Sequence, residues 1–349
     1  MSTALLQHPL RLAARAVALA SVGFAFVWVL FAARNTNFGP AVDDPRSFFV
    51  TLLNGLTFAG LLFIVASGFS LIFGLMRVVN MAHGSFYLLG GYIAWKIQQR
   101  LTGQGFTIAG TDVNSWEWVI PALSAAAAIA VLGLIVQQIF LRWNQGHDLQ
   151  QALITIAISV IVADQVIAHF GGVAVSVTWP GWTNRLVDLR LFDIQYSLAR
   201  LTLLALGVLV AAALWFWLYR TRTGMVIRAG VDDQEMTSAL GINIQVTFAI
   251  AFVVGSALAA FGGAVGASQG GIGSGQDGQW LLNSLVVVII GGMGSLVGAV
   301  AGSLLYGLVF SFSAVYLPAE STQYSIVFTF ILLALVLAFR PQGLFGRSG

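Results

Sequence analysis

The chain has 349 residues, of which 58% are hydrophobic and only 8% are charged, whereas about a quarter of the residues in an ordinary soluble domain are charged. This composition predicts an integral membrane protein. With no cysteine, four histidines and 13 acidic residues, disulfide and thiolate chemistry are excluded, and we expect neither a metal site nor catalytic residues. The net charge of +3 comes almost wholly from scattered arginines, which indicate membrane topology rather than nucleic-acid binding.

Apolar stretches near the roughly 20 residues needed to cross hydrocarbon follow one another along the chain. The first is too long for the apolar region of a signal peptide, so we expect it to be retained. Eight stretches are clear, at about 12–33, 48–73, 118–140, 150–170, 198–219, 245–268, 296–317 and 324–339. Two others, 84–99 and 280–293, are shorter and bordered by glycine-bearing sequence, so they predict short or broken helices. The expected fold is all-α and polytopic, a single membrane domain over 1–349 with about eight to ten transmembrane or broken helices.

The basic residues predict the orientation. If all ten segments cross, both termini and the loops 141–149 and 220–244 lie on one side of the membrane. That side holds nine of the 16 basic residues, namely Arg11, Arg15, Arg77, Arg142, Arg220, Arg222, Arg228, Arg340 and Arg347. Because basic residues concentrate on the cytoplasmic side, we expect both termini in the cytoplasm. The longest polar connection, 171–195, then lies outside, where Trp179 and Trp182 flank a Pro-Gly turn as interfacial aromatics do.

Glycine is frequent, with 39 residues, and clusters near the end of the chain. Gly294, Gly298 and Gly302 recur every four residues, which places them on one face of a predicted helix. Small residues at this spacing let helix backbones approach closely in a membrane. We interpret these three glycines as helix-packing residues.

A short polar segment, 231–242, lies between two long apolar stretches and predicts a helix of two or three turns. Asp232 or Asp233 can cap its start, with Glu235 in the first turn, and Gly241 can end it. Its small apolar edge consists of Met236, Ala239 and Leu240. A helix this short is marginal alone, so it needs another surface, which is either a partner protein or the membrane domain of this same chain.

Polar residues interrupt the apolar pattern at two other places. Asn80 and His83 are flanked by glycines, and such breaks at membrane depth are tolerated only where they face protein or water. The stretch 74–92 is therefore a candidate lining for a translocation path, and a packed kink is the alternative. Its candidate residues are Asn80, His83, Gly84, Tyr87 and Gly91.

Asp164 and Gln165 are the second interruption. An acid inside a span is expensive and is by default a functional candidate, so both residues are candidates for the path. The alternative is that Asp164 lies close enough to the interface to be hydrated. An intramembrane enzyme is disfavoured, because His83 and Asp164 lie on different segments and no nucleophile with a base and an orienting group can be named.

The segment "GMVIRAGVDDQEMTSALGINI", 224–244, resembles the cytoplasmic loop of permease subunits of branched-chain amino acid type ABC importers. In that family, an arginine, an acidic pair and a terminal Leu-Gly-Ile-Asn form a short coupling helix that docks into the ATPase subunit. The matching residues here are Arg228, Asp232, Asp233, Leu240, Gly241, Ile242 and Asn243. If this helix docks as the resemblance implies, its apolar edge of Met236, Ala239 and Leu240 contacts the ATPase, with Glu235 in its first turn. Thr237 departs from the alanine usual at its position.

Three further segments match the same family in the expected order. They are "GLMRVVNMAHGSFYLLGGYIAW", "VIIGGMGSLVGAVAGSLLYGLV" and the tail "RPQGLFG". Together with the coupling loop they cover the core, 48–349, and leave 1–47 as an N-terminal span and connection that adds nothing to the match.

The resemblance implies a permease that moves branched-chain amino acids, or a related small polar solute such as urea or a short amide, across the inner (plasma) membrane into the cytoplasm. The implied partners are a second related permease, commonly forming a heterodimer, two cytoplasmic ATPases that bind ATP and Mg, and an external solute-binding protein. The chain has no GxxxxGK[ST] phosphate loop, so we expect it to bind no nucleotide itself. The alternative is a self-sufficient secondary transporter or channel, which the lack of several intramembrane acids disfavours.

Overall fold

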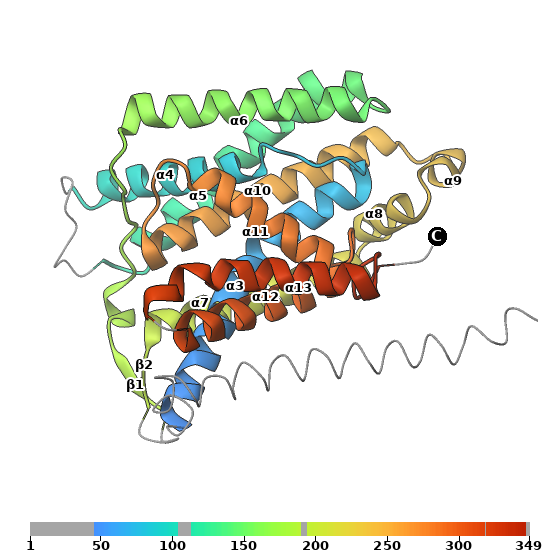
Figure 1. The fold of residues 1–349 in the computed structure, drawn as a ribbon. Helices are drawn as coiled ribbons and strands as arrows, with labels where there is room; N and C mark the ends of the chain where they lie inside the picture. The colour runs from blue at the N-terminus through green and yellow to red at the C-terminus, as the bar shows by residue number, and fades with distance from the viewer. Residues whose placement is uncertain (1–44, 104–112, 190–193, 318, 347–349) are drawn as a thin grey trace, which may run out of the picture.

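The computed structural model describes residues 45–103, 113–189, 194–317 and 319–346 (Figure 1). This part of the chain is a bundle of helices with one two-stranded hairpin, which confirms the all-α fold. Seven of the described helices are long and apolar enough to cross a membrane. They coincide with seven of the eight clear spans expected from the sequence, and the eighth, 12–33, lies outside the described residues.

The bundle helices are α3 (Pro45–Met76), α4 (His83–Leu101), α5 (Trp116–Val136), α6 (Asp148–Phe170), α7 (Leu198–Arg220), α10 (Ile244–Gly270), α11 (Gln276–Gly291), α12 (Leu296–Tyr316) and α13 (Ser325–Phe339). A π-helical turn, Gln137–Leu141, and a 3-10 turn, Arg142–Asn144, continue α5. Two short helices, α8 (Arg222–Asp232) and α9 (Gln234–Ala239), join α7 to α10. Further 3-10 turns are Gly181–Thr183 and Ala319–Tyr324.

The two segments expected to be short or broken helices, 84–99 and 280–293, both contain a helix. At 84–99, where we expected a short or broken helix, α4 is a continuous helix of 19 residues. The irregular backbone precedes it, at 77–82, where Arg77 has a φ of 54° and α3 ends. The short helix expected at 280–293 is α11, which has 16 residues and stops before Gly292.

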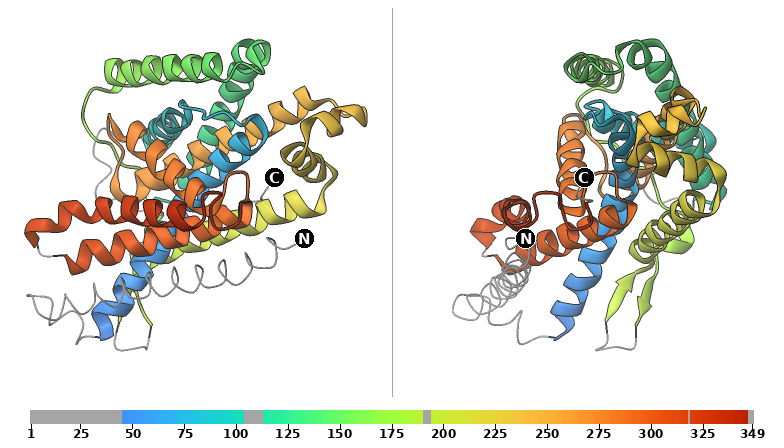
Figure 2. Two further views of the ribbon diagram at one scale, coloured as in Figure 1. Left: turned by 45° about the vertical axis from the view of Figure 1, so that its right-hand side comes forward. Right: turned by 90° about the vertical axis from the view of Figure 1, so that its right-hand side faces the viewer.

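Helix α3 lies at the centre of the bundle, as the three views in Figures 1 and 2 show. It packs against α7, α10, α11 and α12. In its most apolar stretch of 18 residues, 83% of the residues are buried. Its sequence is apolar on every side, so every side can be covered by another helix. Helix α3 therefore positions these four helices directly.

Two glycine pairs bring neighbouring helices to α3 at backbone contact. A Cβ atom added to Gly68 of α3 would lie 2.5 Å from the carbonyl oxygen of Gly255 in α10. On the other side, a Cβ atom added to Gly307 of α12 would lie 2.6 Å from the carbonyl oxygen of Gly55. Lipid supplies no hydrophobic driving force between helices, so close van der Waals contact of this kind holds them together.

The glycine repeat near the end of the chain is only partly on one helix. Gly298 and Gly302 of α12 pack against backbone atoms of α11, as helix-packing residues should. Placing Gly294 on the same helix face is wrong, because α12 begins at Leu296. Gly294 has a φ of 77° in the preceding turn and lies against Gly74 of α3.

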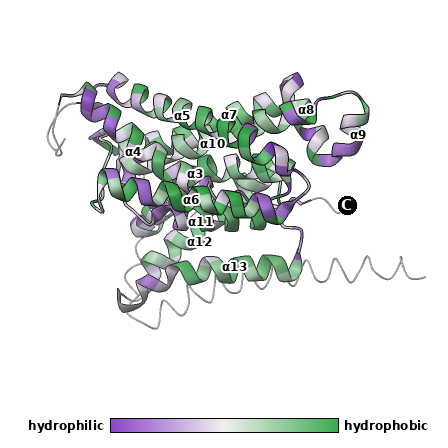
Figure 3. Cartoon of the chain, turned by 90° about the horizontal axis from the view of Figure 1, so that it is seen from above, coloured by the Kyte–Doolittle hydropathy of each residue, from purple (hydrophilic) through white to green (hydrophobic). Residues whose placement is uncertain are grey.

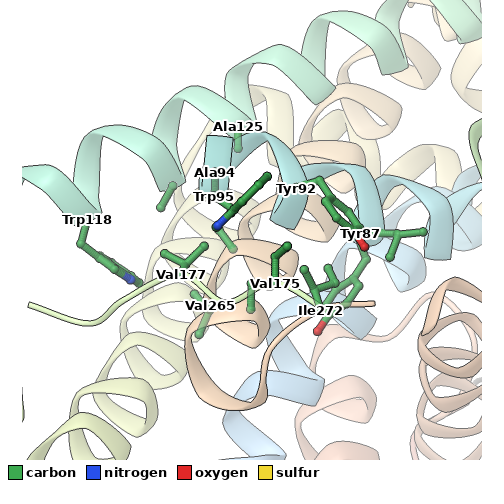
Figure 4. Packing of buried hydrophobic residues seen from close by; sticks show 14 of the residues in the cluster. Tyr87, Tyr92, Ala94, Trp95, Trp118, Ala125, Val175, Val177, Val265 and Ile272 are labelled. Atoms are coloured by element: carbon green, nitrogen blue, oxygen red, sulfur yellow. The ribbon is translucent and has the colours of Figure 1, made fainter. Parts of the chain in front are cut away.

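The long connection after α6 is fixed against the ends of three helices. Val175 pairs with Ile272 in an isolated β-bridge, and Trp179 stacks on Trp118 of α5 with ring centroids 5.0 Å apart. Figure 4 shows Val175, Trp118 and Ile272 in one apolar cluster with the aromatic residues of α4. The connection ends in an antiparallel hairpin of β1 (Leu186–Asp188) and β2 (Gln195–Ser197).

Helix α6 stands apart from the other helices (Figures 1 and 2). Only 11% of its most apolar window is buried. A polar seam joins it to the start of α4: the hydroxyls of Ser85 and Ser159 lie 2.8 Å apart, and Thr155 Oγ1 accepts a hydrogen bond from the Met81 N–H at 3.2 Å. At the other end, the Phe170 ring stacks on Tyr92.

We expect Gly68→Ala to destabilise the bundle by about 1–3 kcal/mol, because its methyl group would overlap the backbone of α10 and force α3 and α10 apart. Thermal unfolding of the purified protein in detergent would measure the loss. Gly270→Ala is the matched control, since a Cβ atom there meets nothing within 4 Å. Equal melting temperatures for the two variants would contradict the backbone contact.

Candidate functional site

The polar segment between α7 and α10 forms two helices instead of one. A single helix over 231–242 is wrong, because α8 ends at Asp232 and α9 begins at Gln234. Asp233 separates them with extended backbone (φ −152°, ψ 108°), and its Oδ1 accepts a hydrogen bond from the Met236 N–H at 2.9 Å. An N-cap residue cannot itself be helical, so the cap divides the segment. We call residues 222–243 the elbow.

The first arm of the elbow is anchored to the bundle. Arg228 donates from Nε to the carbonyl oxygen of Leu218 at 3.1 Å, and its guanidinium lies 4.5 Å from the ring centroid of Tyr219. Ile227 is buried between α8 and the bundle. Arg228 therefore fixes α8 to the end of α7, a role that its match to a coupling motif did not reveal.

The second arm is anchored through α3. Gln234 donates from Nε2 to the carbonyl oxygen of Leu75, near the end of α3. Thr237 is buried and donates from Oγ1 to the carbonyl oxygen of Asp233 at 2.6 Å. The departure from alanine at Thr237 is thus accommodated inside the elbow. The sequence analysis did not identify Gln234 as an anchoring residue. The one feature that could have indicated it was its position directly after the capping Asp233.

The outer edge of the elbow is apolar and exposed. Met236 is 60% exposed and Leu240 is 75% exposed, and Ala239 beside them is also exposed. Figure 3 shows mostly hydrophilic colour along α9 and hydrophobic colour along the bundle helices. The edge is therefore a small apolar strip on a polar arm, and it points away from the chain's own membrane helices.

The remaining coupling residues have local roles. Gly241 has a φ of 83°, a left-handed conformation that favours glycine after a helix. Asn243 caps α10, since its Oδ1 accepts hydrogen bonds from the N–H groups of Gln245 and Val246. The side chains of Asp232 and Glu235 are exposed, and that of Ile242 is partly buried.

The break before α4 is packed inside the chain. His83 is fully buried, its Nε2 lies 3.0 Å from the carbonyl oxygen of Val65, and the Phe69 ring meets it edge-on. Asn80 Oδ1 accepts a hydrogen bond from the Ala82 N–H at 3.1 Å, which helps to start α4. His83 Nδ1 and Asn80 Nδ2 are buried without a partner among the described residues. These contacts are those of a packed kink, and a path through them stays a prediction.

The other candidates on α4 also make packing contacts. Tyr87 stacks on Trp280 of α11 with centroids 4.4 Å apart. Gly84 lies against the backbone of Asp277 in α11, and Gly91 against that of Gly263 in α10. The structure thus brings Asn80, His83, Gly84, Tyr87 and Gly91 together on one helix and its approach, covered by α3, α10 and α11.

Asp164 and Gln165 are separate from this group. Both lie on α6 and are exposed, whereas the α4 candidates are mostly buried. Among the described residues, Asp164 has no hydrogen-bond or ion-pair partner. The two polar interruptions therefore do not form one site within this chain.

No group of three or more histidines and acids that could hold a metal ion occurs among the described residues. The hydrogen-bond partner of the His83 imidazole among the described residues is a backbone carbonyl, that of Val65.

Comparison with known proteins gives a consistent result. Residues 51–337 match the family described as the permease component of branched-chain amino acid transport systems. The chain is 30% identical over 302 residues to the high-affinity branched-chain amino acid transport permease BraD of Pseudomonas aeruginosa, covering 85% of this chain and 95% of that one. It is 28% identical over 319 residues to LivH of Escherichia coli, covering 86% and 96%. No solved structure matches significantly.

A more distant relative has a different solute in its name. The ribose import permease RbsC of Escherichia coli is 24% identical over 286 residues, covering 78% of this chain and 80% of that one.

We expect His83→Phe to lower the stability of the folded protein by about 0.5–1.5 kcal/mol, because the ring keeps its volume and loses a buried hydrogen bond. Thermal unfolding in detergent would measure this loss. His169→Phe is the matched control, since His169 is exposed on α6 and bonds only the Gln165 carbonyl of its own helix. If both variants unfold at the wild-type temperature, the imidazole is not a packing group, and lining of a path would be favoured.

Proposed function

Since the chain belongs to the family of permease components of branched-chain amino acid transport systems, we propose that it moves branched-chain amino acids into the cytoplasm. Like its relatives, it is a transport subunit and not an enzyme. It is a multi-pass protein of the inner membrane. Related small polar solutes, including urea and short amides, are the other candidates.

The elbow is the observation that supports an ATP-driven mechanism. It is held to α7 through Arg228 and to α3 through Gln234, so force applied to it reaches the bundle without a flexible linker. Its free edge offers Met236 and Leu240 to another protein. Burial of these two side chains would contribute roughly 2–5 kcal/mol in the favourable limit, and the partner we propose is a cytoplasmic ATPase subunit.

The rest of the transporter is supplied by other chains in this proposal. ATP and Mg bind to two ATPase subunits, because this chain has no phosphate loop and needs none. A second related permease completes the membrane part in a heterodimer, and an external protein delivers the solute. A self-sufficient transporter is less well supported, because the interiors of the seven described spans contain one charged residue, Asp164, and no series of acids that could couple transport to ions.

Uptake by membrane vesicles holding the whole complex would test this function. Labelled leucine should accumulate only when ATP is inside the cytoplasmic compartment and the binding protein is outside. Urea, acetamide and ribose are the comparison solutes. Uptake that follows an ion gradient without ATP would support the self-sufficient transporter instead.

We expect Leu240→Asp to detach or uncouple the ATPases, because it places a charge in the apolar strip that the partner must bury. ATPase copurification and solute-stimulated ATP hydrolysis should both fall several-fold, while the membrane domain still folds. Gly241→Val should act similarly for a different reason, since a β-branched residue does not tolerate a φ of 83°.

The control is Leu186→Asp, which changes an equally exposed leucine (66%) in β1 and should leave both measurements unchanged. Full ATPase stoichiometry and full stimulation in the Leu240→Asp complex would show that the elbow is only a connector.

The orientation proposed from the arginines can be measured because the chain contains no cysteine. Ser176→Cys, in the exposed connection after α6, should react with a membrane-impermeant maleimide only from outside the cell. Ser238→Cys in α9 should react only from the cytoplasmic side. Both serines are exposed, so access is determined by sidedness alone, and the reversed pattern would refute cytoplasmic termini.

A further inference from the structure

Asp164 is the only charged residue in the interior of the seven described spans. It lies six residues before the end of α6 at Phe170. The other Asp, Glu, Lys and Arg residues of these spans lie within three residues of an end; they are Arg46, Glu117, Arg142, Asp148, Arg200 and Arg220. A helix of 23 residues is about 34 Å long, so Asp164 is roughly 7 Å inside the nearer edge of a hydrocarbon layer of about 30 Å.

The side of α6 that carries Asp164 faces away from the described helices of its own chain. Thr155 and Val166 are buried, each 1% exposed, on the side that meets α4. Two helical positions separate Asp164 from Val166, which is about 200° around the helix, so the two side chains point in opposite directions. Val160 and Ile161, 63% and 61% exposed, lie on the same outer side as Asp164.

Lipid is a poor neighbour for this face. A carboxylate in hydrocarbon finds no hydrogen-bond donor, and acids in spans therefore face protein or water. The exposed face of α7 provides a contrast, because Val208, Leu209 and Phe216 are each more than 60% exposed there and no charged residue interrupts them. The outer face of α6 adds Gln165 to Asp164, and two exposed alanines, Ala157 and Ala168, that permit close approach of another helix.

The described spans of a second copy of this chain offer no cation for Asp164. The interiors of the seven described spans contain no Lys or Arg. Lys96 of α4 does not serve, because it lies one turn beyond Tyr92, which stacks on Phe170 where α6 ends. Charge complementarity therefore favours a different chain, one that presents a basic side chain at this depth.

We propose that the outer face of α6, formed by Ala157, Ile161, Asp164, Gln165 and Ala168, packs against a related but non-identical permease that presents a basic side chain to Asp164. This inference rests on the proposed function, which requires a second permease. This contact also explains why α6 touches its own bundle so little, because the partner covers the outer face of α6.

Photo-cross-linking in native membranes tests the contact. The whole complex is expressed with benzoylphenylalanine replacing Ile161, and the matched control has it at Val208 on α7, which is equally exposed. We expect one protein adduct from Ile161, identified by mass spectrometry as a permease with a different sequence, and only lipid adducts from Val208. Lipid adducts alone at Ile161, or a cross-link between two copies of this chain, would overturn the proposal.

Three smaller changes test the same face without a bulky probe. Asp164→Leu should reduce copurification of the second permease several-fold, and Asp164→Asn should reduce it less. Unchanged copurification in Asp164→Leu would show that lipid covers this face. Ile161→Cys should resist a membrane-impermeant maleimide from both sides, and rapid labelling would indicate a water-filled gap in place of packing.

Uptake separates this inference from the proposed function. If ATP-dependent leucine uptake persists at the wild-type rate in Asp164→Leu, the α6 contact is refuted and the ATP-driven importer is still supported. Leucine uptake by the wild-type complex that does not require ATP would refute the ATP-driven importer itself.

Discussion

Backbone contact at glycine is the constraint on which the arrangement of this protein depends. Helices in lipid gain nothing by hiding apolar side chains from one another, so their positions are set by how closely their surfaces fit. Gly68 and Gly55 let α10 and α12 meet α3 at the backbone. The end of α3 then meets the turn before α12, where Gly74 faces Gly294, and its Leu75 carbonyl receives Gln234 of the elbow. The elbow is thus positioned by the same central helix that positions the bundle.

Burial separates two kinds of polar residue that look alike in the sequence. His83 and Asn80 lie in the break before α4, where the chain's own helices surround them and supply backbone partners. Asp164 lies in a more apolar helix, but it faces outward from that helix, which has little contact with the rest. The first pair shapes the backbone inside one subunit. The outward position of Asp164 is explained by what surrounds the subunit, not by contacts inside it.

The sequence predicted the number and place of the described spans because each is a long apolar run, and that signal needs no knowledge of neighbours. It also predicted an apolar edge with Met236 and Leu240, which the structure exposes, and a cap at Asp232 or Asp233, of which the structure has Asp233. It missed the division of the elbow, because the cap was placed at the start of one helix and α8 before it was not recognised. It missed the position of Gly294 because spacing alone does not reveal a positive φ in a turn. Burial of His83 depends on α3, a contact that spacing cannot reveal.

The weak attachment of α6 has a consequence for movement within the subunit. Displacing α10 or α12 from α3 would break backbone contacts along a whole helix, whereas α6 is joined to α4 by the seam of Ser85, Ser159 and Thr155. Elements with few buried contacts move at the least cost in free energy. The seam ends at Met81, inside the break that joins α3 to α4. A shift of α6 would therefore act on α4 at Ser85 and Tyr92 and, through Met81, on the irregular residues 77–82 before α4.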